Sequence, residues 1–116
     1  MKLPSDSESN SNGGAPSGPV PTIFEAIVRK QCVIATYNRV TMTLAPHVIY
    51  MKHGDLFIDA VAIEREGKPP KEVKIGTFKL AGLNDLKLTT RSFPANPLFH
   101  ANDAKYAEAL MAVEAA

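Results

Sequence analysis

Three side chains of different chemistry, Tyr37, His47 and Lys79, are the strongest candidates for a binding site. A phenol ring can stack on a nucleic-acid base, and an ammonium or imidazolium group can pair with a phosphate. Placed around one groove, the three side chains predict a site for single-stranded nucleic acid or a nucleotide-like ligand. The alternative for each is structural: a tyrosine that closes a strand, a histidine with an internal hydrogen bond, and a solvated lysine.

Other basic and aromatic residues could extend such a site. Basic residues on turns or outward strand positions would form a stripe that tracks a phosphate backbone if they share a face; otherwise they are scattered, solvated charges. They are Arg39, Lys74, Lys87 and Arg91. Tyr50 and Phe57 are possible stacking platforms, although Phe57 also suits a core position. The candidate ligand-binding residues are Tyr37, Arg39, His47, Tyr50, Phe57, Lys74 and Lys79.

The sequence predicts neither an enzyme nor a metal or cofactor site. His47, His53 and His100 lack the paired spacing of metal ligands, and Cys32 has no cysteine partner. Cys32 opens an apolar strand, where thiols are usually buried and inert. Asp55 and Asp59, four apart on a strand, would stand roughly 13 Å apart, too far for a carboxylate pair. We therefore expect no catalytic residue.

Composition favours one small domain in a reducing compartment. The chain has 116 residues, and its net charge of +1 conceals eleven Lys and Arg against seven Asp and Glu in residues 20–100. That excess of four suits a polyanionic partner, although ordinary soluble domains often show as much. The single cysteine excludes an internal disulfide. No secretory signal or apolar run of about 20 residues is present, so we expect a cytoplasmic protein without a membrane segment.

The first elements are a helix and a hairpin. Thr22 and Glu25 form a capping-box pattern, and Ile23, Phe24, Ile27 and Val28 share one face of the helix that follows. Strand patterns follow at 32–37 and 40–44, and Asn38 and Arg39 fit a two-residue turn because Asn tolerates positive φ. Pro46 predicts an edge, bulge or bend before strand continues over 47–51.

Residues 54–63 form the most continuously apolar stretch, which predicts a central strand after a glycine turn. Between residues 72 and 80 the apolar positions change phase, so a bulge or bend at Gly76 would bring them into one core. A last strand is expected where Leu86, Leu88 and Thr90 alternate with polar residues. Tyr106, Leu110 and Val113 then recur at helical spacing, which predicts a short C-terminal helix.

Together these elements predict a mainly β fold: a small, strongly bent antiparallel barrel with an N-terminal helix and a short C-terminal helix. Residues 1–19 are rich in Ser, Asn, Gly and Pro, and we expect a disordered tail there. The β-barrel domain is expected over residues 20–100. Residues 101–116 are expected to form the C-terminal helix or a frayed tail.

The order of these features resembles the WYL domain family over residues 22–93. The matching parts are a basic-ended helix running into a strand that ends at Tyr37, a proline followed by an apolar strand at Pro46–Ile49, Gly54–Asp55 before the signature run, Phe78–Lys79–Leu80, and the exit from Leu86 to Phe93. The signature Trp-Tyr-Leu is Leu56–Phe57–Ile58 here, and the arginine usual after the Phe-basic-Leu element is missing near Ala81. The resemblance implies an Sm-like or SH3-like barrel, here as a divergent, free-standing member.

The resemblance also implies a function. WYL domains are mostly regulatory parts of bacterial transcription factors that sense ligands, including single-stranded nucleic acid. We therefore expect a regulatory ligand-binding domain that senses single-stranded nucleic acid or a small polyanion. The alternative is a protein-interaction or assembly module, with a partner protein or a homodimer formed through the edges of barrel strands.

Overall fold

The computed structural model describes residues 18–114, which begin with helix α1 (Pro19–Arg29). The expected capping box at Thr22 is wrong, because the helix starts three residues earlier. Pro19 and Pro21 lack the N–H groups that a cap would satisfy, and a proline is favourable in the first turn. The Thr22 hydroxyl instead donates to the Gly18 carbonyl at 2.8 Å, and Glu25 pairs with Arg29.

Strands β2 (Gln31–Tyr37) and β3 (Val40–Lys52) form the expected hairpin. Tyr37 pairs with Val40, and the two turn residues Asn38 and Arg39 have φ of 51° and 67°. This is the turn geometry that matches the twist of a hairpin. β3 passes through Pro46 with a register shift between Pro46 and Val48. The predicted irregularity at Pro46 is confirmed as a bulge, and His47 is its extra residue.

The apolar stretch becomes β4 (Asp55–Arg65), which pairs with β3 on one side and β5 (Ile75–Lys79) on the other. Ile58, Ala60 and Asp59 are fully buried. The predicted bulge at Gly76 is wrong, because β5 keeps register with β4 through Ala60 and Gly76. No change of phase is needed, because Val73 is 54% exposed, whereas Phe78 of β5 and Leu80 of the 3-10 turn η1 (Leu80–Gly82) both pack on the main core.

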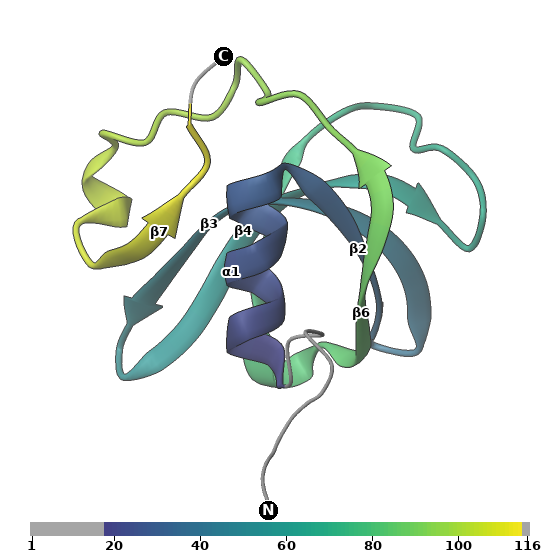
Figure 1. The fold of residues 1–116 in the computed structure, drawn as a ribbon, viewed down its shortest axis with the longest axis horizontal. Coiled ribbons are helices and arrows are strands. Elements are labelled where there is room, and N and C mark those ends of the chain that lie inside the picture. Colours follow the sequence, from purple (N-terminus) through teal and green to yellow (C-terminus); the bar gives the residue numbers. More distant parts are fainter. Residues whose placement is uncertain (1–17, 115–116) are drawn as a thin grey trace, which may run out of the picture.

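The strands form one antiparallel sheet in the order β5-β4-β3-β2-β6, where β6 spans Asn84–Ser92. α1 lies against the hollow side of this strongly curved sheet (Figure 1) and packs on β2, β3 and β6. Within residues 18–114, no ladder joins the end strands β5 and β6. The mainly β antiparallel fold is confirmed, but the sheet does not close into a barrel.

The predicted C-terminal helix is wrong. Its residues form the 3-10 turn η2 (Ala104–Tyr106) and a short strand, β7 (Ala109–Ala112), that pairs with β3. β2 pairs with β3 only as far as Leu44, so the backbone of β3 beyond it needs another partner. The Val113 N–H donates to the His47 carbonyl at 2.7 Å, and the Met51 N–H donates to the Glu108 carbonyl at 3.1 Å. Residues 1–17 of the expected tail lie outside the described residues, and Pro19 already belongs to α1.

The sheet has a core on each face. Ile23 and Ile27 of α1 pack with Leu44, Ile49 and Ile58 on the hollow side. On the other side, Val48 and Tyr50 of β3 form a smaller cluster with Tyr106 of the C-terminal segment, residues 104–112. Alternate residues of β3 and β4 therefore serve two different cores, as the period of two in a strand requires.

Candidate functional site

The structure distributes the seven predicted ligand-binding residues over four places. Tyr37, Arg39 and Lys74 lie at the open end of the sheet, where the β2–β3 hairpin approaches β5. Tyr50 and Phe57 belong to the second core, His47 is buried in the β3 bulge, and Lys79 lies beside the β3–β4 hairpin. The groove expected between Tyr37, His47 and Lys79 does not form.

Tyr37 is half-buried and meets Phe78 edge to face, with 5.2 Å between the ring centroids and 83° between the planes. The ring also lies against Gly82, where an added Cβ would stand 2.9 Å from Tyr37 Cε1. Gly82 therefore leaves the space that the ring occupies. The aromatic pair is held in place by β2, β5 and η1, three elements of the folded sheet.

Two shallow depressions of about 200 Å³ each flank this aromatic pair. One is lined by Tyr37, Asn38 and Val40, the other by Lys74, Glu72 and Gly76, and both include Arg65 and Phe78. We call the residues Tyr37, Asn38, Arg65, Lys74 and Phe78 the Tyr37 surface. Arg39, the second residue of the β2–β3 turn, adjoins this surface and is exposed.

The Tyr37 surface is cationic. Among residues 18–114, neither Arg39 nor Arg65 has an ion-pair partner, while Lys74 pairs with Glu72 at 3.6 Å. Lys74 and Glu72 are both largely exposed, so their ion pair contributes little to stability. The sequence interpretation missed Arg65 and Phe78. Phe78 was interpreted as an apolar position of changed phase and as part of the Phe78–Lys79–Leu80 element, and no local pattern reveals the register that brings Arg65 beside it.

His47 is fully buried, and both of its ring nitrogens are engaged. The Asn96 backbone N–H donates to Nε2 at 2.9 Å, so Nδ1 carries the proton and donates to the Ala45 carbonyl at 2.8 Å. Phe93 and Phe99 pack on the ring, with centroids at 5.1 and 5.4 Å. Burial lowers the pKa of His47, although its bond to Ala45 acts in the opposite direction. His47 therefore has a structural role: it is a buried, neutral imidazole that positions Asn96.

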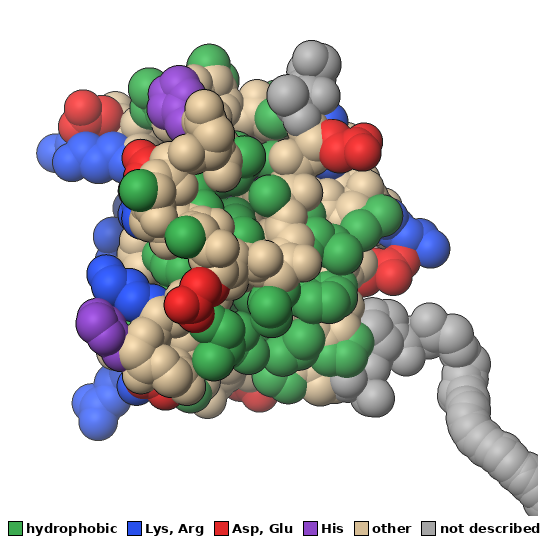
Figure 2. Space-filling model, turned by 90° about the vertical axis from the view of Figure 1, so that its left-hand side faces the viewer, with side chains coloured by type: hydrophobic (Ala, Val, Ile, Leu, Met, Phe, Trp, Pro, Cys, Tyr) green, Lys and Arg blue, Asp and Glu red, His purple; other side chains and the backbone are tan. Residues whose placement is uncertain are grey.

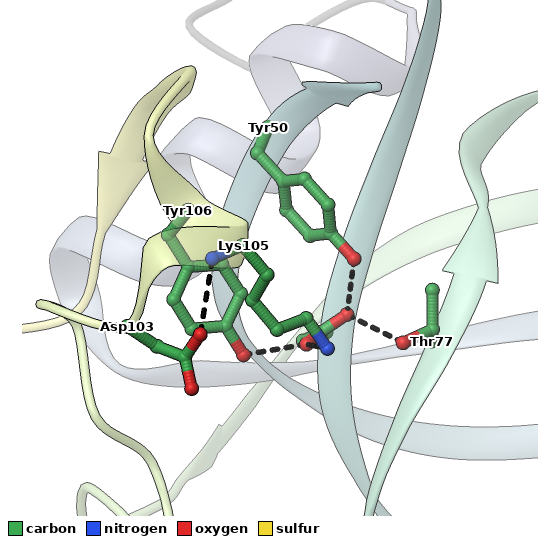
Figure 3. Close-up of polar contacts among 6 residues, drawn as sticks. Tyr50, Thr77, Asp103, Lys105 and Tyr106 are labelled. Atoms are coloured by element: carbon green, nitrogen blue, oxygen red, sulfur yellow. Dashed lines mark hydrogen bonds and ion pairs between the residues drawn. The ribbon is translucent and has the colours of Figure 1, made fainter. Parts of the chain in front are cut away.

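Tyr50 and Phe57 stack at 6.2 Å between centroids in the second core. The Tyr50 hydroxyl donates to Asp59 Oδ1 at 2.7 Å, as does Thr77 at 2.8 Å. Tyr106 and Lys105 approach Asp59 Oδ2 at 2.5 and 2.9 Å. Figure 3 shows these side chains converging from β3, β5 and the C-terminal segment. The Tyr50 hydroxyl is therefore part of an internal hydrogen-bond network around Asp59.

The ionisation of this network follows from burial and hydrogen bonding. Burial acts to raise the pKa of Asp59, but the four donors together outweigh it, and the pKa is lowered. Burial, reinforced by the bond to Asp59, raises the pKa of Tyr50 to about 12 and also raises that of Tyr106. Asp59 is thus an ionised, saturated carboxylate with no free oxygen for a ligand.

Lys79 pairs with Asp55 at 3.4 Å across the β4–β5 edge. It lines a hollow of about 400 Å³ with Val20, Met51 and Leu56, between the start of α1 and the β3–β4 hairpin. Burial raises the pKa of the Cys32 thiol, as an inert structural cysteine requires. Within the described part of the chain, no three metal-ligating side chains gather, and no helix is long and apolar enough to cross a membrane.

Comparisons with protein-family models, with curated proteins and with solved structures gave no match.

Proposed function

We propose that this chain is a WYL-like regulatory domain that binds single-stranded nucleic acid or a small polyanion on the Tyr37 surface. One observation carries the proposal: the Tyr37–Phe78 pair adjoins Arg65, a guanidinium without an ion-pair partner among the described residues. Aromatic rings beside unpaired cations are what sequence-tolerant binding of single strands requires, because every base can stack and every nucleotide carries a phosphate.

The fold supports the family part of this proposal. A leading helix sits in the hollow of a strongly bent antiparallel sheet, and η1 carries the chain from β5 to β6. We propose that this is an Sm-like or SH3-like barrel that has remained open between β5 and β6. The signature positions Leu56, Phe57 and Ile58 lie in β4. A regulatory role in bacterial transcription is part of the same proposal.

The charges set the expected salt dependence. If Arg39, Arg65 and Lys74 each contact a phosphate, the logarithm of affinity falls with a slope of about −2 against the logarithm of salt concentration. Affinity then drops about 20-fold for a fourfold increase in salt.

Fluorescence anisotropy with labelled single-stranded DNA and RNA at two salt concentrations tests the proposal. We expect Arg65→Ala and Phe78→Leu to weaken binding by about tenfold, since a stacked base or a charged contact is worth about 1–3 kcal/mol. Lys87→Ala, on exposed β6, is the matched cationic control, and Lys79→Ala should also leave binding unchanged. Absence of binding at micromolar protein in low salt would exclude the proposed ligand class.

A second candidate is an assembly module that pairs through the free edge of β7. Among the described strands β7 pairs only with β3, and Leu110 on β7 and Val28 on α1 are 50% and 67% exposed. On the side of the molecule that carries β7, hydrophobic side chains form a broad patch with charged ones mostly at its margins (Figure 2). An unpaired apolar edge of this kind can accept a strand of another chain.

Light scattering separates this candidate from the first. A dimer that dissociates in Leu110→Lys, but persists in Val73→Lys at the other side of the sheet, would support pairing through β7. A monomer at every concentration would eliminate it. Val73 is an equally exposed apolar residue, at 54%, which makes it a fair control.

A further inference from the structure

A fourth concave region lies apart from the aromatic pair of the Tyr37 surface. It is a cleft of about 410 Å³ between the β4–β5 loop and the segment that follows β6. Pro69, Pro70 and Val73 form one wall, and residues 93–97 form the other, with Ala45 and Val61 between them. The volume lies in the range of pockets that hold small molecules. We call this region the proline cleft.

The lining of the proline cleft is apolar and poor in hydrogen-bond donors. Four of its residues, Pro69, Pro70, Pro94 and Pro97, have no backbone N–H to offer. His47 also lines it, but both ring nitrogens are already engaged. Val73 at the cleft is 54% exposed, so an apolar occupant there would remove hydrophobic surface from water.

Two side chains supply the remaining polar character. Arg91 is the one charged residue among the described residues that line the cleft. Its Nη1 lies 3.3 Å from Glu64 Oε2, and the guanidinium has further N–H groups beyond that contact. Asn96 accepts the Leu98 N–H with its side-chain oxygen at 2.8 Å, which orients its amide nitrogen as a donor. Both Arg91 and Asn96 can therefore donate hydrogen bonds to an acceptor on a ligand.

We propose that the proline cleft binds a small apolar carboxylate, with its hydrocarbon part between the proline walls and its carboxylate on Arg91. A permanent positive charge as the single charged lining group favours an anion over a neutral acceptor. The planar guanidinium can engage both oxygens of a carboxylate, and Asn96 can donate to the same group. This site and the Tyr37 surface use different cations, Arg91 and Arg65.

The test is an NMR titration of the full chain with 3-phenylpropanoate and octanoate, each beside its primary amide. We expect saturable, millimolar binding of the carboxylates, with amide shifts confined to the cleft residues Val73, Ala95 and Asn96. The amides should bind about tenfold more weakly, because a charge-assisted hydrogen bond to the guanidinium is lost. Arg91→Gln should reduce carboxylate affinity by a similar factor, while Arg39→Gln should not.

A second variant is needed because replacing Arg91 also removes its ion pair with Glu64. Ala95→Phe fills the cleft without touching that pair, and it should abolish binding of the carboxylates. Equal affinity for carboxylate and amide, shifts outside the cleft, or absence of shifts with both carboxylates would overturn the proposal. None of these results would bear on nucleic-acid binding by Arg65, which the anisotropy experiment measures separately.

Discussion

The Tyr106 hydroxyl lies 2.5 Å from Asp59 Oδ2, and this contact joins the C-terminal segment to the middle of the sheet. The two oxygens of Asp59 have different partners. Oδ1 accepts from Tyr50 and Thr77, on the strands either side of β4, while Oδ2 accepts from Lys105 and Tyr106 of η2. One buried carboxylate thus ties three neighbouring strands to the segment that delivers β7.

Tyr106→Phe should destabilise the protein by about 1–3 kcal/mol, because it removes one donor from a buried carboxylate. The loss should be local before it is global. Hydrogen exchange at Val113 and Met51, whose N–H groups hold β7 on β3, should accelerate, while amides of the β2–β3 hairpin stay protected. Unchanged exchange at Val113 would contradict the role given to Asp59. Lys105→Ala should cost less, because the Lys105 side chain is 44% exposed.

The stability of the fold should decrease as pH falls through the range of histidine titration. The pKa of buried His47 is lowered, so below about pH 6.5 the unfolded chain binds a proton that the folded chain resists. Urea unfolding should therefore show a slope of at most about 1.4 kcal/mol per pH unit from this group. The lowered pKa of Asp59 adds stability that disappears only at lower pH, as pH falls through its folded value below 3.8.

His47→Gln is the variant that isolates the first effect. It removes the titrating group, so its stability should change less between about pH 7 and pH 5 than that of the parent chain, whatever its absolute value. A pH slope that survives the substitution intact would assign the effect to other groups.

Gly82→Ala should disturb the Tyr37 surface without replacing any of its residues. The added methyl group would meet Tyr37 Cε1 at 2.9 Å, so the ring must shift and its edge-to-face contact with Phe78 must open. Nucleic-acid affinity should fall severalfold in the anisotropy assay. Ala81→Ser, one position earlier on the same turn and exposed, is the control. Parent-like binding by Gly82→Ala would remove the ring of Tyr37 from the site.

Arg39→Gly should move stability and binding in opposite directions. Arg39 has φ of 67°, which costs a residue with a side chain more than it costs glycine, so stability should rise by roughly 0.5–1 kcal/mol. Binding should weaken, because a cation beside the proposed binding surface is lost. Thermal unfolding and anisotropy on one preparation measure both. A parallel gain in stability and affinity would place Arg39 outside the interface.

Sequence patterns were sufficient where local chemistry determines structure. The turn at Asn38 and Arg39, the buried strand after Gly54 and the irregularity at Pro46 all depend on residues close in the chain. The C-terminal segment was misread because Tyr106, Leu110 and Val113 have helical spacing, yet the unpaired backbone of β3 offers β7 hydrogen bonds that a small isolated helix could not match. Long-range pairing overrode local propensity.

The site was predicted less well than the fold, for the same reason. Tyr37 and Lys74 share a surface, but His47 and Lys79 face other parts of the molecule. Residue type identified possible chemistry without the register that decides which side chains meet. Asp59 is the one charge between Leu56 and Ile63, but its partners lie up to 47 positions away in the chain, and no short-range pattern indicates them.

The division of one edge of β3 between β2 and β7 has a consequence for biosynthesis. β2 precedes β3 in the chain, but β7 is the last of the described strands to leave the ribosome. Until then, the half of β3 from His47 onward presents unpaired backbone beside apolar side chains, the kind of surface on which nascent chains aggregate. We therefore expect any dependence on chaperones during synthesis to arise after β3 has emerged and before Val113 emerges.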